Sequence, residues 1–155
     1  MALDIRRASL SSPDASRLIT ALNAELTATF PEPGATHFSL SREQVAEGDG
    51  AFLIVYVGGE AVGCGAIRRV DGTERGEIKR MFVTPACRGE GIGRAIVAAL
   101  EDEARRLGFS EVVLETGTRL PAAIALYESS GYARIPLFGE YTQSPDTSLC
   151  YGKTL

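Results

Sequence analysis

The 155-residue sequence has few residues of the kinds that build metal sites, disulfide frameworks or nucleic-acid surfaces. Its three cysteines, Cys64, Cys87 and Cys150, are scattered and form no Cys-x-x-Cys pair, and there is one histidine. This pattern fits a reducing cytosol and neither a disulfide framework nor a zinc site. The formal net charge of −4 argues against a broad nucleic-acid surface, which needs clustered excess lysine and arginine. We therefore expect no metal and no nucleic-acid partner.

Long apolar runs are also missing. None approaches the roughly 18 residues that a bilayer-spanning helix needs. The first residues lack the basic region and apolar core of a signal peptide. These absences predict a cytoplasmic protein with no membrane partner. The length and the 45% of apolar residues allow one hydrophobic core without disulfides or metal, so we predict a single domain over residues 1–155.

Apolar periodicity and turn residues predict a mixed order of elements. Two apolar runs joined by Gly58-Gly59 indicate a hairpin, and Asp71-Gly72 marks the turn to a third strand. Within that third strand, strict alternation would place Glu77, Lys79, Met81 and Val83 on one face. The predicted elements are a strand over 3–8, a helix over 13–30, a short helix over 41–47, strands over 51–57, 61–70 and 76–83, a helix over 91–107, a strand over 111–116, a helix over 121–130, and strands near 132–135 and 148–154.

A glycine-rich turn, Arg88-Gly89-Glu90-Gly91-Ile92-Gly93, joins the third strand of this meander to the next helix. Glycines let the backbone approach a ligand closely, and a helix N-terminus offers unpaired N–H groups that suit phosphate. Two common phosphate loops do not fit, because the Gly-Lys-Ser/Thr of a Walker A is absent and no frame gives Gly-x-Gly-x-x-Gly. The turn therefore either binds phosphate of another kind or serves only to reverse the chain.

The same turn matches the Arg/Gln-x-x-Gly-x-Gly/Ala motif of the GNAT superfamily of acyl-CoA N-acyltransferases, which the chain resembles over essentially its whole length. Further matches to small bacterial members lie at 77–81 (Glu-Ile-Lys-Arg-Met), 114–117 (Leu-Glu-Thr-Gly), 123–132 and 138–141 (Phe-Gly-Glu-Tyr). The resemblance implies an α/β fold of the GNAT type: a mixed, mostly antiparallel, splayed sheet of six to seven strands with helices on both faces. It also implies acetyl-CoA as co-substrate and a homodimer as a common assembly.

The resemblance assigns the donor half of a site. Backbone groups of Met81, Phe82 and Val83 would pair with the pantetheine arm of the cofactor. One position departs from the family, since many members have Asn where this chain has Leu120, so that contact is lost or replaced. The cofactor pyrophosphate would be held by Arg88, Gly89, Glu90, Gly91, Ile92, Gly93 and Arg94.

Acid–base residues are needed because an amine attacks only in its neutral form. Deprotonation at pH 7 costs roughly 4–5 kcal/mol for a lysine side chain but about 1 kcal/mol for an α-amino group. Glu77 is the first candidate for the base, since its spacing to Gly91 resembles that of the catalytic glutamate of the histone-acetylating branch; the alternative is an ion pair with a nearby Arg or Lys. Glu115, near the end of a central strand, is a second candidate. Tyr127 occupies the family position that protonates the departing thiolate.

The acceptor half is less defined by the sequence. His37 would titrate in the right range for a base, but a lone histidine in a loop is more often structural or exposed. His37, Phe38, Phe138 and Tyr141 are candidates for binding the acceptor. The acidic pI and small size favour a small-molecule amine, such as an amino acid, over a protein lysine or N-terminus. A non-catalytic acyl-CoA-binding module and a nucleotide-binding domain of another fold are the alternative classes.

Overall fold

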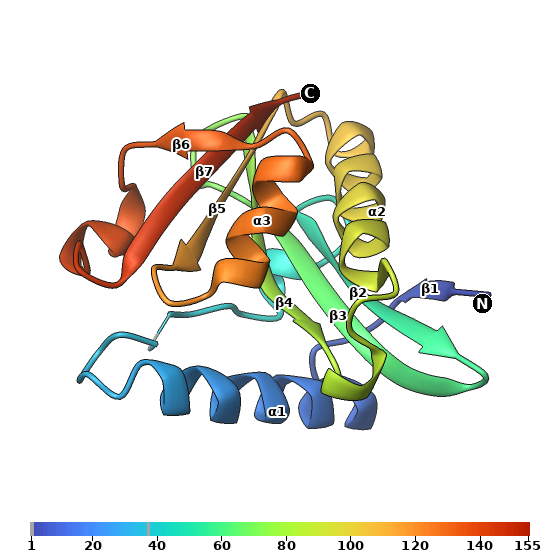
Figure 1. Cartoon of the computed structure of the whole chain (residues 1–155). Helices are drawn as coiled ribbons and strands as arrows, with labels where there is room; N and C mark the ends of the chain where they lie inside the picture. Colours follow the sequence, from blue (N-terminus) through green and yellow to red (C-terminus); the bar gives the residue numbers. More distant parts are fainter. Residues whose placement is uncertain (1, 37) are drawn as a thin grey trace.

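A computed structural model of the chain describes residues 2–36 and 38–155. Seven strands form one sheet in the order β1-β2-β3-β4-β5-β7-β6, and helices cover both of its faces (Figure 1). In chain order the elements are β1 (Asp4–Arg7), α1 (Pro13–Thr29), the 3-10 helix η1 (Glu43–Val45), β2 (Gly50–Val57), β3 (Glu60–Arg69), β4 (Arg75–Val83), the 3-10 helix η2 (Pro85–Cys87), α2 (Ile92–Arg106), β5 (Glu111–Gly117), α3 (Pro121–Ser129), β6 (Ala133–Ile135), the 3-10 helix η3 (Gly139–Gln143) and β7 (Ser148–Thr154).

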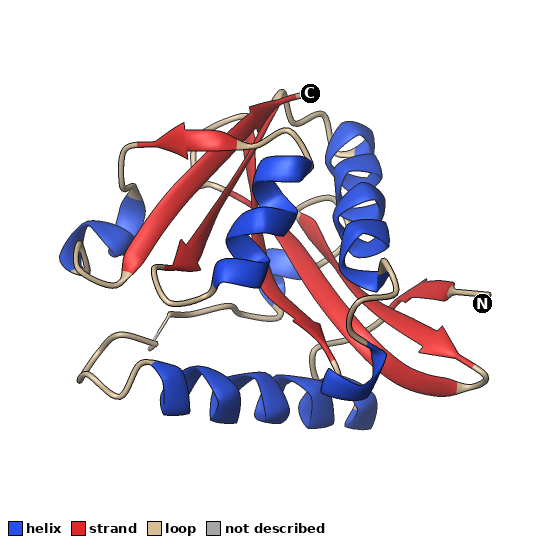
Figure 2. Ribbon diagram, in the orientation of Figure 1, coloured by secondary structure: helices blue, strands red, loops and turns tan. Residues whose placement is uncertain are grey.

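The predicted order of helices and strands is confirmed, and local signals explain the helix ends (Figure 2). The Ser12 hydroxyl accepts a hydrogen bond from the backbone N–H of Ala15 at 3.2 Å, and Pro13 opens the first turn of α1. Beyond α2, Gly108 adopts the expected left-handed conformation with φ of 82°. No helix in the described part of the chain is long and apolar enough to cross a membrane.

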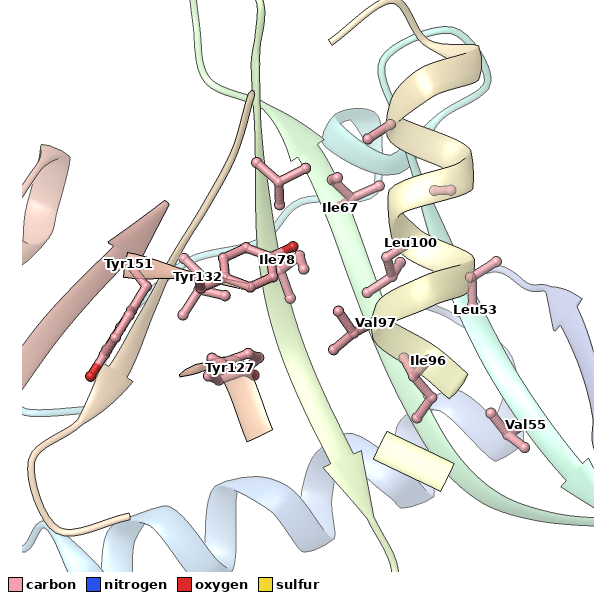
Figure 3. Packing of buried hydrophobic residues seen from close by; sticks show 14 of the residues in the cluster. Leu53, Val55, Ile67, Ile78, Ile96, Val97, Leu100, Tyr127, Tyr132 and Tyr151 are labelled. Carbon is pink, nitrogen blue, oxygen red and sulfur yellow. The ribbon is translucent and has the colours of Figure 1, made fainter. Parts of the chain in front are cut away.

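Two hydrophobic cores lie on opposite faces of the sheet, and alternate residues of β2 enter each of them. Phe52 and Ile54 pack against α1, whereas Leu53 and Val55 pack on the α2 side. Because helices cover both faces, every one of these residues is buried, which explains the continuous apolar run in the sequence. Figure 3 shows the α2-side core, in which Leu53 and Val55 meet Ile96, Val97 and Leu100.

The sheet splays between β4 and β5, which form its one parallel pair among the described strands. Their pairing runs from Arg75 opposite Glu111 to Ile78 opposite Leu114 and ends there. Beyond this point the two strands diverge (Figure 1). The residues of β4 from 79 to 83 therefore have no strand partner on that side, as the predicted splayed sheet requires.

A β-bulge interrupts β4 at Arg80, whose φ of 58° is the one positive value among the described non-glycine residues. The register with β3 shifts at the same place. An extra residue in one strand reverses the alternation that follows it. Consequently Glu77 and Lys79 face the α1 side, while Met81 and Val83 pack against the α2-side core. The prediction that these four side chains share one face is therefore wrong.

Candidate active site

A cavity of about 470 Å³ lies where β4 and β5 separate. Its volume is within the range of small-ligand sites. Residues of α1 and the loop after it line one wall, and the N-terminal ends of α2 and α3 line the other. The cavity therefore connects the glycine-rich turn with the face of the sheet that α1 covers.

Most of the predicted donor residues line this cavity. Arg94 does not, and its guanidinium instead donates to the Ser129 hydroxyl at 2.9 Å. Glu90 is exposed and also lies outside the lining. The predicted residues that line the cavity are Met81, Phe82, Val83, Arg88, Gly89, Gly91, Ile92 and Gly93.

The glycine-rich turn leaves the first amides of α2 without a side-chain cap. Gly89 and Gly91 have φ of 82° and 84°, and a Cβ at either position would meet open space. Positive φ, rather than crowding, is therefore the reason for glycine here. Gly91 caps α2 but has no side chain to accept from the N–H groups of the first turn. Those N–H groups and the helix dipole are suited to an anion.

Arg88 stands beside this turn in an exposed ion pair with α1. One of its guanidinium nitrogens lies 2.9 Å from each carboxylate oxygen of Glu25, and its Nε donates to the Val83 carbonyl at 2.9 Å. Both side chains are more than 40% exposed. An exposed ion pair of this kind contributes little to stability, so Arg88 can exchange its partner at small cost.

Tyr127 comes from α3 and lines the cavity. Burial, together with the negative charge of Glu115, raises the pKa of the Tyr127 phenol above its usual value. The phenol is therefore protonated at neutral pH. Within residues 2–36 and 38–155, the Tyr127 hydroxyl makes no hydrogen bond. Every fully buried side-chain N or O atom in that part of the chain has a partner, so the Tyr127 hydroxyl is not fully buried. The hydroxyl is thus accessible to a ligand in the cavity.

Leu120, the position at which the sequence departs from the resemblance, precedes α3 and lines the cavity. It occupies the N-cap of α3 but provides no side-chain hydrogen bond. Its side chain offers a bound cofactor apolar contact only.

Glu77 and Glu115 occupy different environments on neighbouring strands. Glu77 is 0% exposed and outside the cavity lining. One of its carboxylate oxygens pairs with Arg68 at 2.9 Å, and the other accepts the Tyr141 hydroxyl. The ion pair that the sequence left as an alternative is therefore present, and this geometry leaves Glu77 no free oxygen for an amine proton.

Glu115 lines the cavity and keeps one carboxylate oxygen free of hydrogen bonds to the described residues. Its other oxygen accepts the Ser148 hydroxyl at 2.6 Å. Burial raises the pKa of Glu115 to about 7, the Ser148 hydrogen bond opposes this shift, and the charge of Glu77 adds to it. A carboxyl group with this pKa is suited to exchanging protons near neutral pH.

The predicted acceptor residues are only partly brought together. Phe38 and Tyr141 line the cavity, and their ring centroids are 4.7 Å apart in an edge-to-face arrangement. Phe138 packs behind Tyr141 at 5.3 Å and does not line the cavity. His37 lies outside the described residues.

Two cations at the cavity wall were not predicted as site residues. Lys79 and Arg80 belong to the Glu-Ile-Lys-Arg-Met match, and both line the cavity, although neither was a candidate site residue. Two adjacent cations directly before the apolar end of the strand, Met81 to Val83, were the available signal. The place of Arg80 depends on the bulge and could not be inferred from alternation.

The cavity runs from a phosphate-type turn along an unpaired strand edge to a buried phenol, which is the shape that an extended thioester cofactor needs. The class of protein that this fold and site define is an acyltransferase that uses acyl-CoA. Comparisons with known proteins agree: a family model described as acetyltransferase (GNAT) family matches residues 16–132. The chain belongs to the GNAT family.

Individual relatives support the same assignment. The chain is 42% identical to the IAA acetyltransferase of Azospirillum brasilense over 113 residues. This aligned region covers 73% of this chain and 74% of that protein. A candidate acyl-CoA N-acyltransferase from Klebsiella pneumoniae has a similar crystal structure, with a TM-score of 0.81, 32% identity and coverage of 99% and 97%. A GNAT acetyltransferase from Elizabethkingia anophelis with acetyl-CoA bound shares the fold, at a TM-score of 0.70, 15% identity and coverage of 99% and 98%.

Proposed function

We propose that the chain, as one domain over residues 1–155, transfers an acetyl group from acetyl-CoA to the primary amine of a small molecule. The observation that carries this proposal is that Tyr127 and Glu115 line the same cavity as the glycine-rich turn. A proton donor, a proton acceptor and an anion-binding helix end thus surround one space. Neither a nucleotide-binding domain nor a simple cofactor-binding module needs the first two.

The donor would lie along the unpaired part of β4. Backbone groups of Met81 and Val83, which no strand partner occupies on that side, would bind the pantetheine arm as a neighbouring strand does. The amides from Arg88 to Gly93 would receive the pyrophosphate. This arrangement places the thioester in the splay, between Tyr127 on one side and Glu115 on the other.

The reaction then requires three proton transfers. Glu115 takes one proton from the ammonium group of the acceptor, and the neutral nitrogen attacks the thioester carbon. The carbon–sulfur bond breaks as the carbonyl re-forms, and the thiolate takes the hydroxyl proton of Tyr127. The proton that the nitrogen loses on becoming an amide restores Tyr127. Acetyl-CoA and the ammonium are thereby converted to the amide, CoA thiol and the proton held by Glu115.

The two acid–base groups are electrostatically coupled. The charge of Glu115 contributes to the raised pKa of Tyr127. Once Glu115 has accepted the amine proton, that charge is neutralised and the phenol becomes a better donor. Deprotonation of the acceptor therefore prepares the protonation of the leaving thiolate.

A small acceptor is favoured by the way the acceptor end is covered. Phe30, after α1, packs over Gly117 so closely that a Cβ there would come within 2.2 Å of the ring. Arg119 ties the same region to β5 by donating to the Thr29 carbonyl at 3.0 Å and by an ion pair with Glu32. This packing holds the segment after α1 across the cavity, where it would obstruct a folded protein substrate.

The test is incubation with acetyl-CoA and a panel of amines, with free thiol and product mass as readouts. We expect thiol release with at least one small amine and a mass increase of one acetyl group on that amine. Turnover with lysine peptides or peptide N-termini alone would instead identify a protein acetyltransferase. Cofactor binding without turnover of any amine would indicate a non-catalytic module and contradict the proposal.

Replacing Arg88 by alanine is expected to raise the KM for acetyl-CoA roughly 10-fold with little change in kcat, because one charge-assisted contact to the pyrophosphate is lost. Steady-state kinetics at saturating amine measure this. The matched control is Glu25→Gln, which removes the competing partner of Arg88 and should leave KM equal or lower. An unchanged KM in Arg88→Ala would place the pyrophosphate elsewhere.

A further inference from the structure

We propose that Lys79 and Arg80 bind a carboxylate of the acceptor beside Glu115, so that the acceptor is an amine with a nearby carboxylate, as in an α-amino acid. This inference deepens the proposed function and rests on it. Its basis is the placement of two cations and one proton acceptor at the start of the splay.

The register of the parallel pair places Lys79 next to Glu115. Ile78 and Leu114 are the last paired residues of β4 and β5, so Lys79 and Glu115 are the first residues beyond the pairing. In parallel strands in register, such residues lie on the same face. Both line the cavity. An ammonium and a carboxylate of one small molecule could therefore contact both at once.

Lys79 is buried to an unusual degree for a lysine, with a side chain only 2% exposed. Its Nζ lies 3.2 Å from a carboxylate oxygen of Glu140, on η3 at the rim, where the glutamate is 36% exposed. A second nearby carboxylate, Glu77, is already paired with Arg68. Burying an ammonium is costly unless it is well paired. The ion pair with the exposed carboxylate of Glu140 therefore offsets the cost of burying Lys79 only in part.

Arg80 follows Lys79 and adopts the left-handed conformation of the bulge. This conformation is energetically unfavourable for a residue other than glycine. Strained backbone is retained where the surrounding structure uses it. One guanidinium nitrogen donates to the Phe38 carbonyl at 2.7 Å, and the hydrogen bonds found within the described residues give the guanidinium no other acceptor. Arg80 lines the cavity, so its remaining N–H groups are available to a ligand.

The charges of the acceptor end match a zwitterion. With Glu115 ionised, its carboxylate faces an incoming ammonium while the two cations face a carboxylate. After Glu115 has taken the amine proton, the acceptor end has one more cationic side chain than ionised carboxylates. The carboxylate of the bound acceptor balances this extra charge. The groups counted are Arg68, Lys79, Arg80, Glu77, Glu140 and Glu115.

The test compares an uncharged-side-chain amino acid, leucine, with leucinamide, which keeps the amine but lacks the carboxylate. We expect kcat/KM for leucine to exceed that for leucinamide roughly 100-fold, because the amide leaves buried cations unpaired. Lys79→Met should bring the ratio of kcat/KM for leucine to kcat/KM for leucinamide close to one, mainly by raising the KM for leucine, and leave the KM for acetyl-CoA unchanged. Lys79→Arg should restore part of the preference.

Lys153→Met is the matched control, since Lys153 is also ion-paired, with Glu101 at 3.0 Å, but lies outside the cavity lining. Lys153→Met should leave kcat/KM unchanged for both leucine and leucinamide. Equal turnover of leucine and leucinamide, unaffected by Lys79→Met, would overturn the inference while leaving the acetyltransferase proposal intact. Calorimetric binding of the same pair to the CoA complex measures the carboxylate preference without turnover. Equal binding there would overturn the inference even if no amine were acetylated.

Discussion

Replacing Glu115 by glutamine is expected to lower kcat/KM for the amine acceptor about 10²- to 10³-fold, the range typical of a lost general base. In the wild-type protein, kcat/KM should fall as pH decreases through about 7, where the raised pKa of Glu115 lies. The variant should lack this acidic limb. Rate measurements from pH 5.5 to 9 at saturating acetyl-CoA test both expectations.

The same substitution is expected to stabilise the protein at pH 8. The pKa of Glu115 is about 7 in the folded protein, whereas an unfolded glutamate has a pKa of about 4.3. Below both values the carboxyl is neutral in both states. As the pH rises between them, only the unfolded state ionises, so stability falls and stays lower above pH 7. Glutamine removes this cost of roughly 4 kcal/mol and still accepts the Ser148 hydrogen bond. Thermal melts should show a gain at pH 8 and little change at pH 4.

Glu77→Gln is the matched control, since it makes the same change one strand away. It breaks a buried pair and leaves Arg68 without its partner, so a stability loss of about 3 kcal/mol is expected. The acidic limb should persist in the folded variant but move to lower pH, because the charge of Glu77 helps to raise the pKa of Glu115. If the limb instead vanished in Glu77→Gln and remained in Glu115→Gln, Glu77 would be the base, as the sequence spacing first suggested.

The contrast between these two glutamates shows what the sequence could determine about the site. The glycine-rich turn and the position of Tyr127 depend on contiguous residues, so their locations could be predicted from local pattern. Glu77 faces Arg68 because of the register between β3 and β4, whereas Glu115 reaches the cavity beside Lys79 because β4 and β5 pair across more than 30 residues of chain. The spacing from Glu77 to Gly91 contains neither register and therefore favoured Glu77.

The bulge at Arg80 limits sequence inference in a second way. Order, type and approximate bounds of the elements followed from periodicity and from turn residues such as Gly58-Gly59 and Gly108. An arginine in a left-handed conformation has no such local signal, because glycine or asparagine is the residue expected there. The face on which Met81 lies, and the exposure of Lys79 and Arg80 to the cavity, could be known only from the fold.

Replacing Tyr127 by phenylalanine is expected to lower kcat about 10²-fold or more while leaving the KM for acetyl-CoA nearly unchanged. The ring continues to fill its place in the α2-side core, but the thiolate has no proton donor. A thiolate leaving into a buried cavity is disfavoured without one. Single-turnover thiol release, which isolates the chemical step from product dissociation, measures the effect.

Tyr132→Phe separates this chemical effect from a general weakening of the core. Tyr132 packs edge-to-face on Tyr127 with ring centroids 6.1 Å apart, but its hydroxyl donates to Glu101 at 2.8 Å and is outside the cavity lining. Loss of the Tyr132 hydroxyl should lower the stability by about 1 kcal/mol and leave kcat close to the wild-type value. If both variants lost rate in proportion to stability, packing would explain the result. If Tyr127→Phe kept its full rate, the thiolate would obtain its proton from another source and Tyr127 would serve only to close the cavity.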